Sequence, residues 1–293
     1  MILAKLRGGL SNQMFQYAAA RRLAHCHRTG VRIDASWYDT QQGATPRRYE
    51  LGQLRISGEL ASRWETIGTD GVRNSRLYEL PVALYRKLRP RYRFVAEQTF
   101  HFDSRILKLP DDVCLFGYWV SERYFADIAD IIREEFEFQE PPSPATVLRL
   151  DQLRSCESVA VHVRRGDYAA NPHLTSIHGL CGPEYYSQAA KVIRDRVPDP
   201  VFFLFSDDLE WAVDNVNLGG ETIVVDDNRD EASPQDLRLM SGARHNIIAN
   251  SGFSWWGAWL NTNPTKVICA PKQWLADPSY DTSDVIPDPW IAL

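Results

Sequence analysis

The sequence predicts an α/β protein whose C-terminal half is Rossmann-like, with a parallel sheet. From residue 158 onward, short apolar segments rich in valine, isoleucine and phenylalanine alternate with helical segments. This alternation is typical of a parallel sheet covered on both faces. The chain of 293 residues is also long enough for two domains, each with its own core.

The first half opens with a β-loop-α-β pattern. Residues 2–6 predict a strand and residues 31–34 predict a second one. The apolar residues between them repeat at helical spacing, and Ser11 or Asn12 is expected to cap this helix. Residues 40–112 are rich in arginine and aromatic residues and support no assignment.

A domain boundary is predicted near the middle of the chain. Residues 113–119 predict a buried strand, and Ser121 is expected to cap a helix with one apolar face. The proline-rich residues 141–144 should then end regular structure, because proline cannot donate a backbone hydrogen bond. We therefore expect two domains, 1–144 and 145–293.

The second half is predicted to contain a series of strands, at residues 158–163, 201–206, 222–227, 246–250 and 266–271. Helices are expected between them, near residues 184–196, 208–216, 234–244 and 254–261. The segments that leave the first four strands are polar: HVRRGDY, SDD, DDNRD and NSGFSWW. Because the carboxyl ends of parallel strands share one edge, where open α/β folds bind ligands, these segments predict one binding site.

Composition excludes several classes of protein. A net charge of −5 gives no general attraction to nucleic acid, so an anion site must come from a local basic cluster. The five cysteines are scattered and predict reduced core residues instead of a disulfide framework or a zinc site. No apolar run has the length of a signal peptide or a membrane helix, which predicts a cytoplasmic location. No G-x-G-x-x-G or Walker A motif is present.

Two adjacent arginines, Arg164 and Arg165, directly follow the strand at 158–163. Guanidinium groups suit a phosphate ligand because they are always charged and offer planar, bidentate donors. In an extended segment adjacent side chains point to opposite sides, so one arginine can face a ligand while the other braces Asp167 or the sheet edge. This position favours an anion site over a solvated surface pair.

The start of the predicted helix at 254–261 has two readings. Asn250, Ser251 and Ser254 could cap this helix, or they could offer donors to an anion that the helix N-terminus attracts. The tryptophans of the same helix could belong only to the core.

Asp207 and Asp208 suggest a metal site at first sight. No further carboxylate with metal-ligand spacing joins them, so a helix cap by Asp207 or Ser206 is the better reading. We predict no metal site.

Several segments together resemble one enzyme family: GGLSNQMFQYAAA (8–20), GYWVSERYF (117–125), HVRRGDY (162–168), HG followed by EYY (178–186), FSDD (205–208), DLRLMSGARHNIIANSGFSWWGAWLN (236–261) and APKQW (270–274). They are similar to the inverting α-1,2-fucosyltransferases, within the wider HxRRxD fucosyltransferase superfamily. The resemblance spans nearly the whole chain in the family's order. One departure is Ser11, where the family usually has glycine.

The resemblance implies a GT-B-like architecture of two Rossmann-like halves that face a cleft. Residues 1–144 would be the acceptor-side domain and residues 145–293 the domain that binds the nucleotide sugar. GDP-L-fucose would be the donor and a co-substrate, with no cofactor and no required metal. The acceptor would be O2 of a galactose in an oligosaccharide or a lipid-linked glycan, the latter implying peripheral contact with the inner membrane surface.

The resemblance also implies donor contacts at matching positions. His162 and Asp236 would contact the guanosine end of the donor. Ser254, with the N-terminus of its helix, would receive phosphate oxygens. Asn12 would reach the donor from the first half of the chain.

Catalysis in this family needs a cation at the leaving phosphate and a group that takes the acceptor's proton. Arg165, together with Arg164, would neutralise the β-phosphate of GDP. The candidates for the base are Asp167, His173 and His178, and we favour His178 because it lies in a matching segment. The leaving phosphate could also accept the proton, leaving Asp167 as an arginine brace.

Two other functions remain open from the sequence. The first is transfer of another GDP sugar, or of fucose in another linkage such as α-1,6. The second is a binding protein that displays Arg165-Gly166-Asp167 as an adhesion motif. The attachment of this tripeptide to a buried strand argues against a flexible adhesion loop.

Overall fold

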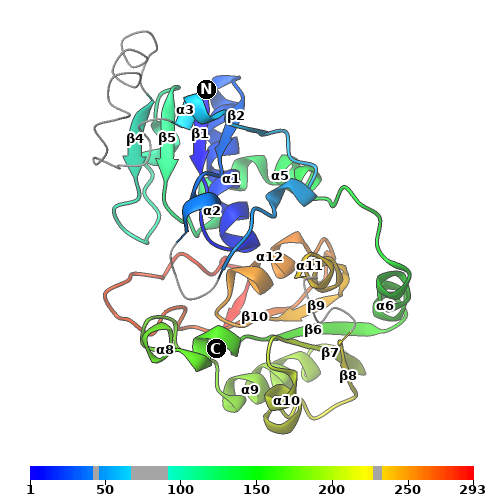
Figure 1. The fold of residues 1–293 in the computed structure, drawn as a ribbon. Coiled ribbons are helices and arrows are strands. Elements are labelled where there is room, and N and C mark those ends of the chain that lie inside the picture. The colour runs from blue at the N-terminus through cyan, green and yellow to red at the C-terminus, as the bar shows by residue number, and fades with distance from the viewer. Residues whose placement is uncertain (42–45, 67–91, 227–232) are drawn as a thin grey trace. The chain divides into compact units, whose positions relative to one another are not determined.

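The structure, a computed structural model, describes residues 1–41, 46–66, 92–226 and 233–293 (Figure 1). The chain divides into two compact units, Met1–Gln139 and Glu140–Leu293. None of the described helices combines the length and the hydrophobicity that a membrane span requires. All five cysteines are free, and Cys26 is exposed instead of lying in a core as expected.

The end of the proline-rich segment begins a helix. Pro144 is the first residue of α6 (Pro144–Arg154), and the Ser143 hydroxyl caps this helix by accepting the N–H of Thr146 at 3.1 Å. Proline suits the first helical position, where its missing N–H has no helical partner to lose. The segment at 141–144 therefore begins regular structure as well as ending it, and the two units separate just before it.

The N-terminal unit contains a five-stranded sheet of order β3-β2-β1-β5-β4, in which every pair of neighbours is parallel. Its strands are β1 (Ile2–Lys5), β2 (Val31–Asp34), β3 (Glu59–Leu60), β4 (Arg93–Ala96) and β5 (Val113–Phe116). Its helices are α1 (Leu10–His27), α2 (Trp37–Thr40), α3 (Arg63–Thr66) and α5 (Ala129–Glu135), with 3-10 turns η1 (Leu51–Gln53), η2 (Ile106–Lys108), η3 (Glu122–Tyr124) and η4 (Ala126–Ile128). The predicted β-loop-α-β opening is confirmed.

Helix α1 begins earlier than the sequence predicts. Its N-cap is Gly9, so neither Ser11 nor Asn12 caps it. Gly8 adopts a φ of +80°, which glycine reaches at no steric penalty, and this turns the chain from β1 into the helix. The side-chain amide of Gln13 then donates to the Gly8 carbonyl at 3.1 Å. The positive φ of this turn thus lies at Gly8, and the serine at position 11 is compatible with the helix.

The predicted helix after Ser121 is divided into η3, η4 and α5. The Ser121 hydroxyl accepts the N–H of Arg123 at 3.4 Å, so its capping role is confirmed for the short η3 turn. Tyr124 and Phe125 are both fully buried, although consecutive residues of an α-helix point about 100° apart. The break lets both rings pack into the core, which explains why the single predicted helix is wrong.

The C-terminal unit contains a six-stranded sheet of order β11-β10-β9-β6-β7-β8, again with all neighbours parallel. Its strands are β6 (Glu157–Val163), β7 (Pro200–Ser206), β8 (Thr222–Val224), β9 (His245–Ile247), β10 (Ile268–Ala270) and β11 (Ile291–Ala292). Besides α6, its helices are α7 (Gly166–Ala170), α8 (Pro172–His178), α9 (Pro183–Arg194), α10 (Leu209–Asn215), α11 (Ser233–Gly242) and α12 (Gly252–Leu260). The five predicted strands and four predicted helices are confirmed, whereas α6, α7, α8 and β11 were not predicted.

Each face of this sheet carries its own apolar cluster. One cluster joins the valines of β6 to α9 and α10, and the other joins Ala160 to α6 and α11. In Figure 1, α11 and α12 lie on one side of the sheet and α9 and α10 on the other. The sheet is therefore covered on both faces, as its continuous apolar strands predict.

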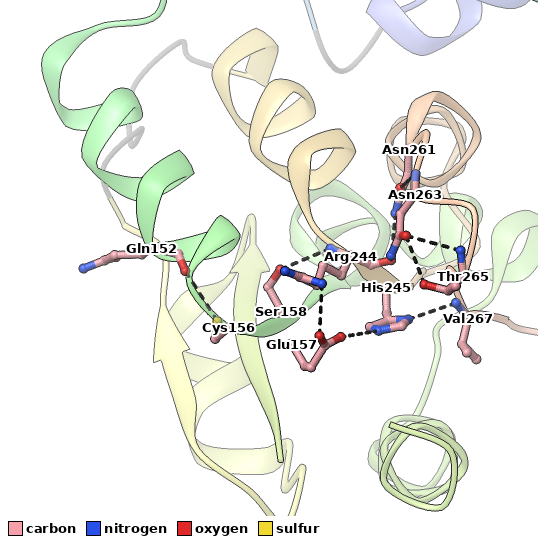
Figure 2. A network of polar contacts seen from close by, with 10 residues as sticks. All are labelled: Gln152, Cys156, Glu157, Ser158, Arg244, His245, Asn261, Asn263, Thr265 and Val267. Carbon is pink, nitrogen blue, oxygen red and sulfur yellow. Dashed lines mark hydrogen bonds and ion pairs between the residues drawn. The ribbon is translucent and has the colours of Figure 1, made fainter. Parts of the chain in front are cut away.

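A polar network fixes the amino ends of β6 and β9 (Figure 2). His245 Nδ1 accepts the N–H of Val267 at 3.0 Å, so the proton of the neutral ring lies on Nε2, 3.2 Å from a Glu157 oxygen. The other Glu157 oxygen pairs with Arg244 at 3.0 Å. Burial lowers the pKa of His245. The network ties together the amino ends of β6 and β9. Arg164 and Arg165 follow the opposite, carboxyl end of β6.

Gly257→Ala should destabilise the C-terminal unit. A Cβ at Gly257 would lie 2.8 Å from the Cβ of Met240, where α12 packs on α11. A glycine-to-alanine change inside a helix ordinarily stabilises by up to about 1 kcal/mol. Here the overlap reverses the sign, and we expect a loss of about 1–3 kcal/mol in the free energy of urea unfolding. Gly30→Ala, whose added Cβ meets nothing within 4 Å, is the control. Equal stability of Gly257→Ala and wild type would contradict the close packing.

Candidate active site at the carboxyl edge of the C-terminal sheet

The alternation of side chains along β6 decides which way the two arginines point. Ala160 packs toward α6 and α11, and His162 continues this series with its ring 5.8 Å from that of Phe253 in α12. By the same alternation, the side chain of Arg164 points to the same side of the sheet as that of His162. The side chain of Arg165 points to the opposite side, toward α10. The two cations therefore serve opposite faces of the sheet edge.

Arg164 is held by two carboxylates. Its guanidinium donates to Asp207 at 2.6 Å and to Asp167 at 2.5 Å, and it lies 5.0 Å from the centre of the Tyr168 ring. A Cβ on Gly166 would lie 2.5 Å from an oxygen of the Asp207 carboxylate, so a larger residue here would require the carboxylate to shift. The brace between Arg164 and Asp167 is one that the sequence anticipated. The other N–H groups of the guanidinium stay available to a ligand.

Arg165 is held mainly through its backbone and by stacking. Its N–H donates to Asp207 at 2.8 Å, and its guanidinium carbon lies 3.7 Å from the ring centre of Trp211 in α10. Its Nε is buried and lies 3.6 Å from an Asp208 oxygen, beyond hydrogen-bond length. Asp207 thus joins both arginines, and the side chain of Arg165 rests on α10.

Helix α10 is capped by Asp208. Its carboxylate accepts the N–H of Trp211 at 3.3 Å, while the Ser206 hydroxyl accepts the N–H of Asp208 at 2.9 Å. The expected cap by Asp207 or Ser206 is therefore wrong by one or two positions. Asp207, the residue directly after β7, instead holds the two arginines through its carboxylate.

His162 is buried between charges of opposite sign. Burial lowers the pKa of His162 to about 4, with Asp207 acting to raise it and Arg164 to lower it further. The ring is therefore neutral at pH 7. Its Nδ1 has no hydrogen-bond partner among the residues that the structure describes. A buried ring nitrogen without a partner favours a ligand contact at this point.

His178 lies close to the same charges. Its ring stacks on that of Tyr168, with centres 4.3 Å apart and planes within 4°. Burial lowers the pKa of His178, while Asp167 raises it and Arg164 lowers it. The imidazole is neutral at neutral pH and can accept a proton.

The N-terminus of α12 adjoins this edge, because the helix follows β9 directly. Ser251 is its N-cap residue but makes no side-chain capping bond, and the Ser254 hydroxyl donates to the Ser251 carbonyl at 3.3 Å. Asn250 is used differently, because its amide donates to the His178 carbonyl at 2.7 Å and, at 3.4 Å, to the Trp274 carbonyl. Asn250 therefore holds the loop that carries His178.

The other predicted site residues lie in three places. Asp236 is half-buried in the first turn of α11. Asn12 belongs to α1 of the N-terminal unit and packs over Gly8. His173 is exposed on α8, and its N–H donates to the Asn171 side chain. Residues 227–230 of the predicted DDNRD segment lie outside the described residues.

Sequence reasoning missed Tyr168 and Trp211, and it considered Asp207 only as a cap or a metal ligand. Tyr168 belongs to the HVRRGDY segment, but helical spacing does not mark its contact with Arg164, because Arg164 precedes α7. In the described parts of the chain, no three or more His, Cys, Asp or Glu side chains group as metal ligands would.

The sequence matches a known family over most of its length. Residues 86–293 match the family described as Glycosyl transferase family 11. The chain belongs to glycosyl transferase family 11. The family resemblance predicted from the sequence is confirmed, and the protein is a glycosyltransferase.

Relatives within the family share nearly the full chain. The O-antigen biosynthesis glycosyltransferase WbnK of Escherichia coli is 33% identical over 302 residues, which are 98% of this chain and 99% of the relative. An α-1,2-colitosyltransferase of Escherichia coli is 32% identical over 302 residues, which are 100% of this chain and 99% of the relative. The galactoside 2-α-L-fucosyltransferase SEC1 of Bos taurus is 26% identical over 277 residues, and the match covers 84% of this chain and 75% of the relative.

A solved structure shows the same fold. The GDP complex of an Arabidopsis thaliana FUT1 mutant matches with a TM-score of 0.53 and 11% identity, over 98% of this chain and 72% of that one. This family 11 glycosyltransferase therefore has the α/β, GT-B-like fold that the resemblance implied, with two parallel sheets.

Acid should weaken the fold through His162. Its pKa is about 4 in the folded protein against 6.5 ordinarily, so the unfolded chain binds the proton first as the pH falls. The stability that this ring contributes is complete above pH 6.5 and is lost as the pH falls toward 4. Urea unfolding across this range should show a flatter profile for His162→Gln than for wild type. His173→Gln, an exposed change, is the control, and an unaltered profile in His162→Gln would contradict the assignment.

Proposed function

We propose that this glycosyltransferase moves L-fucose from GDP-L-fucose to O2 of a galactose in a glycan acceptor, by a single inverting displacement. Two relatives support the linkage, because both a colitosyltransferase and a galactoside fucosyltransferase carry α-1,2 or 2-α transfer in their names. GDP-L-fucose acts as a co-substrate in this proposal, with no cofactor and no required metal. The C-terminal unit binds the donor and the N-terminal unit binds the acceptor.

The contacts of Arg164 are the observation that carries the proposal. In sugar transfer the bond from C1 to the diphosphate oxygen lengthens, and negative charge grows on the leaving diphosphate. A fixed cation at that point stabilises the transition state without reorganising. Arg164 is fixed in advance by Asp167 and Asp207 and retains N–H donors for the phosphate oxygens.

The sequence resemblance gave the phosphate contact first to Arg165. The structure leads us to propose Arg164 for it, because Arg164 shares a side of β6 with His162 and with Phe253 of α12. Arg165 braces this segment against α10. Ser254 and the N-terminus of α12 would receive further phosphate oxygens, and Asp236 and Asn12 keep their proposed donor contacts.

His178 is the proposed general base. An inverting displacement requires a group that takes the proton from the attacking hydroxyl as the new bond forms. His178 suits this role because its lowered pKa keeps it neutral at pH 7 and because it lies near Arg164. Asp167 is occupied with Arg164, which favours its role as a brace.

A second donor sugar has a specific observation in its favour. The α-1,2-colitosyltransferase matches the whole of this chain, so a GDP-linked deoxy sugar other than fucose is a candidate. A panel of GDP-L-fucose, GDP-colitose and GDP-mannose with one β-galactoside separates these donors.

Linkage analysis of the product by NMR separates 2-linked from 6-linked fucose. Transfer from GDP-mannose alone, or a 6-linked product, would overturn the proposal. The proposal also expects transfer to continue in excess EDTA.

A lipid-linked acceptor would bring the enzyme to the cytoplasmic face of the inner membrane. This location is part of the proposal and depends on which acceptor is used. Flotation with vesicles that contain the lipid-linked galactoside would test it, with plain vesicles as the control.

Arg164→Lys should lower kcat by about 10² to 10³, because lysine keeps the charge but cannot hold the two carboxylates and the phosphate with one planar group. Arg165→Lys is the matched variant and should lose less than about tenfold, since stacking on Trp211 does not deliver charge to the phosphate. Steady-state kinetics with GDP-fucose and a β-galactoside would measure both. A larger loss in Arg165→Lys than in Arg164→Lys would reverse the assignment of the two roles.

His178→Gln should remove the acidic limb of the kcat profile. Activity requires the neutral ring, so in the wild type kcat falls as the pH drops through the pKa of His178, which lies below 6.5. Loss of a general base typically lowers the rate by about 10² to 10⁴. His173→Gln serves as the exposed control. A normal kcat and an unchanged acidic limb in His178→Gln would rule out this base.

A further inference from the structure

The N-terminal unit holds a second cation at the carboxyl edge of a parallel sheet. Arg7 follows β1 at the point where the chain leaves the strand. Its backbone is fixed by Gln16, whose side-chain oxygen accepts the Arg7 N–H at 3.0 Å and whose nitrogen donates to the Arg7 carbonyl at 3.3 Å. The position of Arg7 is therefore set by helix α1 as well as by the strand.

Two aromatic rings hold the guanidinium of Arg7. Its central carbon lies 4.6 Å from the ring centre of Phe116, the last residue of β5, and 4.1 Å from that of Tyr118, two residues further on. Contact with a ring face restrains a guanidinium plane while leaving its N–H edge open. This arrangement holds the guanidinium of Arg7 between Phe116 and Tyr118 at the sheet edge.

No carboxylate in the described residues pairs with this guanidinium, and its Nε is buried without a hydrogen-bond partner. The nearby Glu97 carboxylate is used by the backbone instead, accepting the N–H groups of Tyr118 at 2.7 Å and Trp119 at 2.9 Å. By contrast, Arg164 in the C-terminal unit is held by two carboxylates. A fixed, partly buried guanidinium without a protein anion is complementary to an anion from outside the protein.

We propose that Arg7 binds an oxyanion of the acceptor, either the carboxylate of an acidic sugar or the phosphate of a lipid-linked glycan. The inference rests on the proposed function only in treating the N-terminal unit as the acceptor side. It adds that the acceptor is negatively charged and that Arg7 determines this preference. Both oxyanions offer two oxygens to the planar edge of one guanidinium.

Three acceptors that share a terminal β-galactose separate the sources of the charge. The first is a neutral galactosyl-glucoside, the second is a galactosyl-glucuronate, and the third is a galactoside on an alkyl diphosphate. Affinity for each is measured by calorimetric titration of the complete protein in the presence of GDP, so that the readout does not depend on which sugar is transferred. GDP affinity is measured separately by the same method.

The wild type should bind one of the two anionic acceptors about ten- to a hundredfold more tightly than the neutral one, as expected for a hydrogen-bonded charge pair. In Arg7→Gln this ratio should fall to about twofold or less. Arg7→Lys retains a charge without the planar edge and should show an intermediate ratio, and it serves if the glutamine variant does not fold. Arg55→Gln, an exposed arginine paired with Glu137, is the matched control and should keep the wild-type ratio.

Three results would overturn the proposal. Equal affinity of wild type for neutral and anionic acceptors would show that no acceptor anion is bound. If Arg7→Gln lowered the affinity for all three acceptors equally, Arg7 would be assigned to the packing of β1 and β5. Weakened GDP binding in Arg7→Gln would assign the anion to the donor. None of these outcomes depends on whether fucose is the sugar transferred, so a failed fucosyl assay and a failed Arg7 test remain distinguishable.

Discussion

The candidate site depends on one carboxylate, that of Asp207. It joins the end of β7 to the segment after β6 by accepting the N–H of Arg165 and a guanidinium N–H of Arg164. The carboxylate packs closely against Gly166, where an added Cβ would lie 2.5 Å from one of its oxygens. Through this one group the sheet edge holds Arg164 on the side of His162 and Arg165 on the side of Trp211.

The electrostatics of the edge follow from this arrangement. Two arginines and nearby carboxylates lie close together, so the edge is fixed by its own ion pairs before any ligand binds. The two neutral histidines are a consequence of burial at the same place, since desolvation is the largest influence on the pKa of each. Fixed cations and neutral imidazoles are what a displacement with an anionic leaving group and a hydroxyl nucleophile requires. In the proposed function, Arg164 supplies the fixed charge and His178 accepts the proton.

The sequence predicted the strands of the C-terminal unit well because they are continuous apolar runs, whose length and composition alone distinguish them from helices. It also placed Arg164 and His162 at the carboxyl edge of the sheet, because strand order and parallel topology fix which residues lie there. It could not assign the arginines to their roles, because that depends on Asp207 and Trp211, which reach them from another strand and helix. Helix rules failed at Gly9, where the turn at Gly8 starts the helix early, and at Phe125, where packing of both aromatic rings breaks it.

In the proposed function, the carboxyl edge of the C-terminal sheet, around Arg164 and the first turn of α12, receives the diphosphate of the donor. Amide hydrogen exchange of the whole chain with and without GDP tests this claim directly. The account predicts slower exchange with GDP at residues 164–166 and 252–254, with the amino ends of β6 and β9 unchanged. Saturating GDP that leaves both of these segments unprotected, while protecting amides elsewhere, would contradict it.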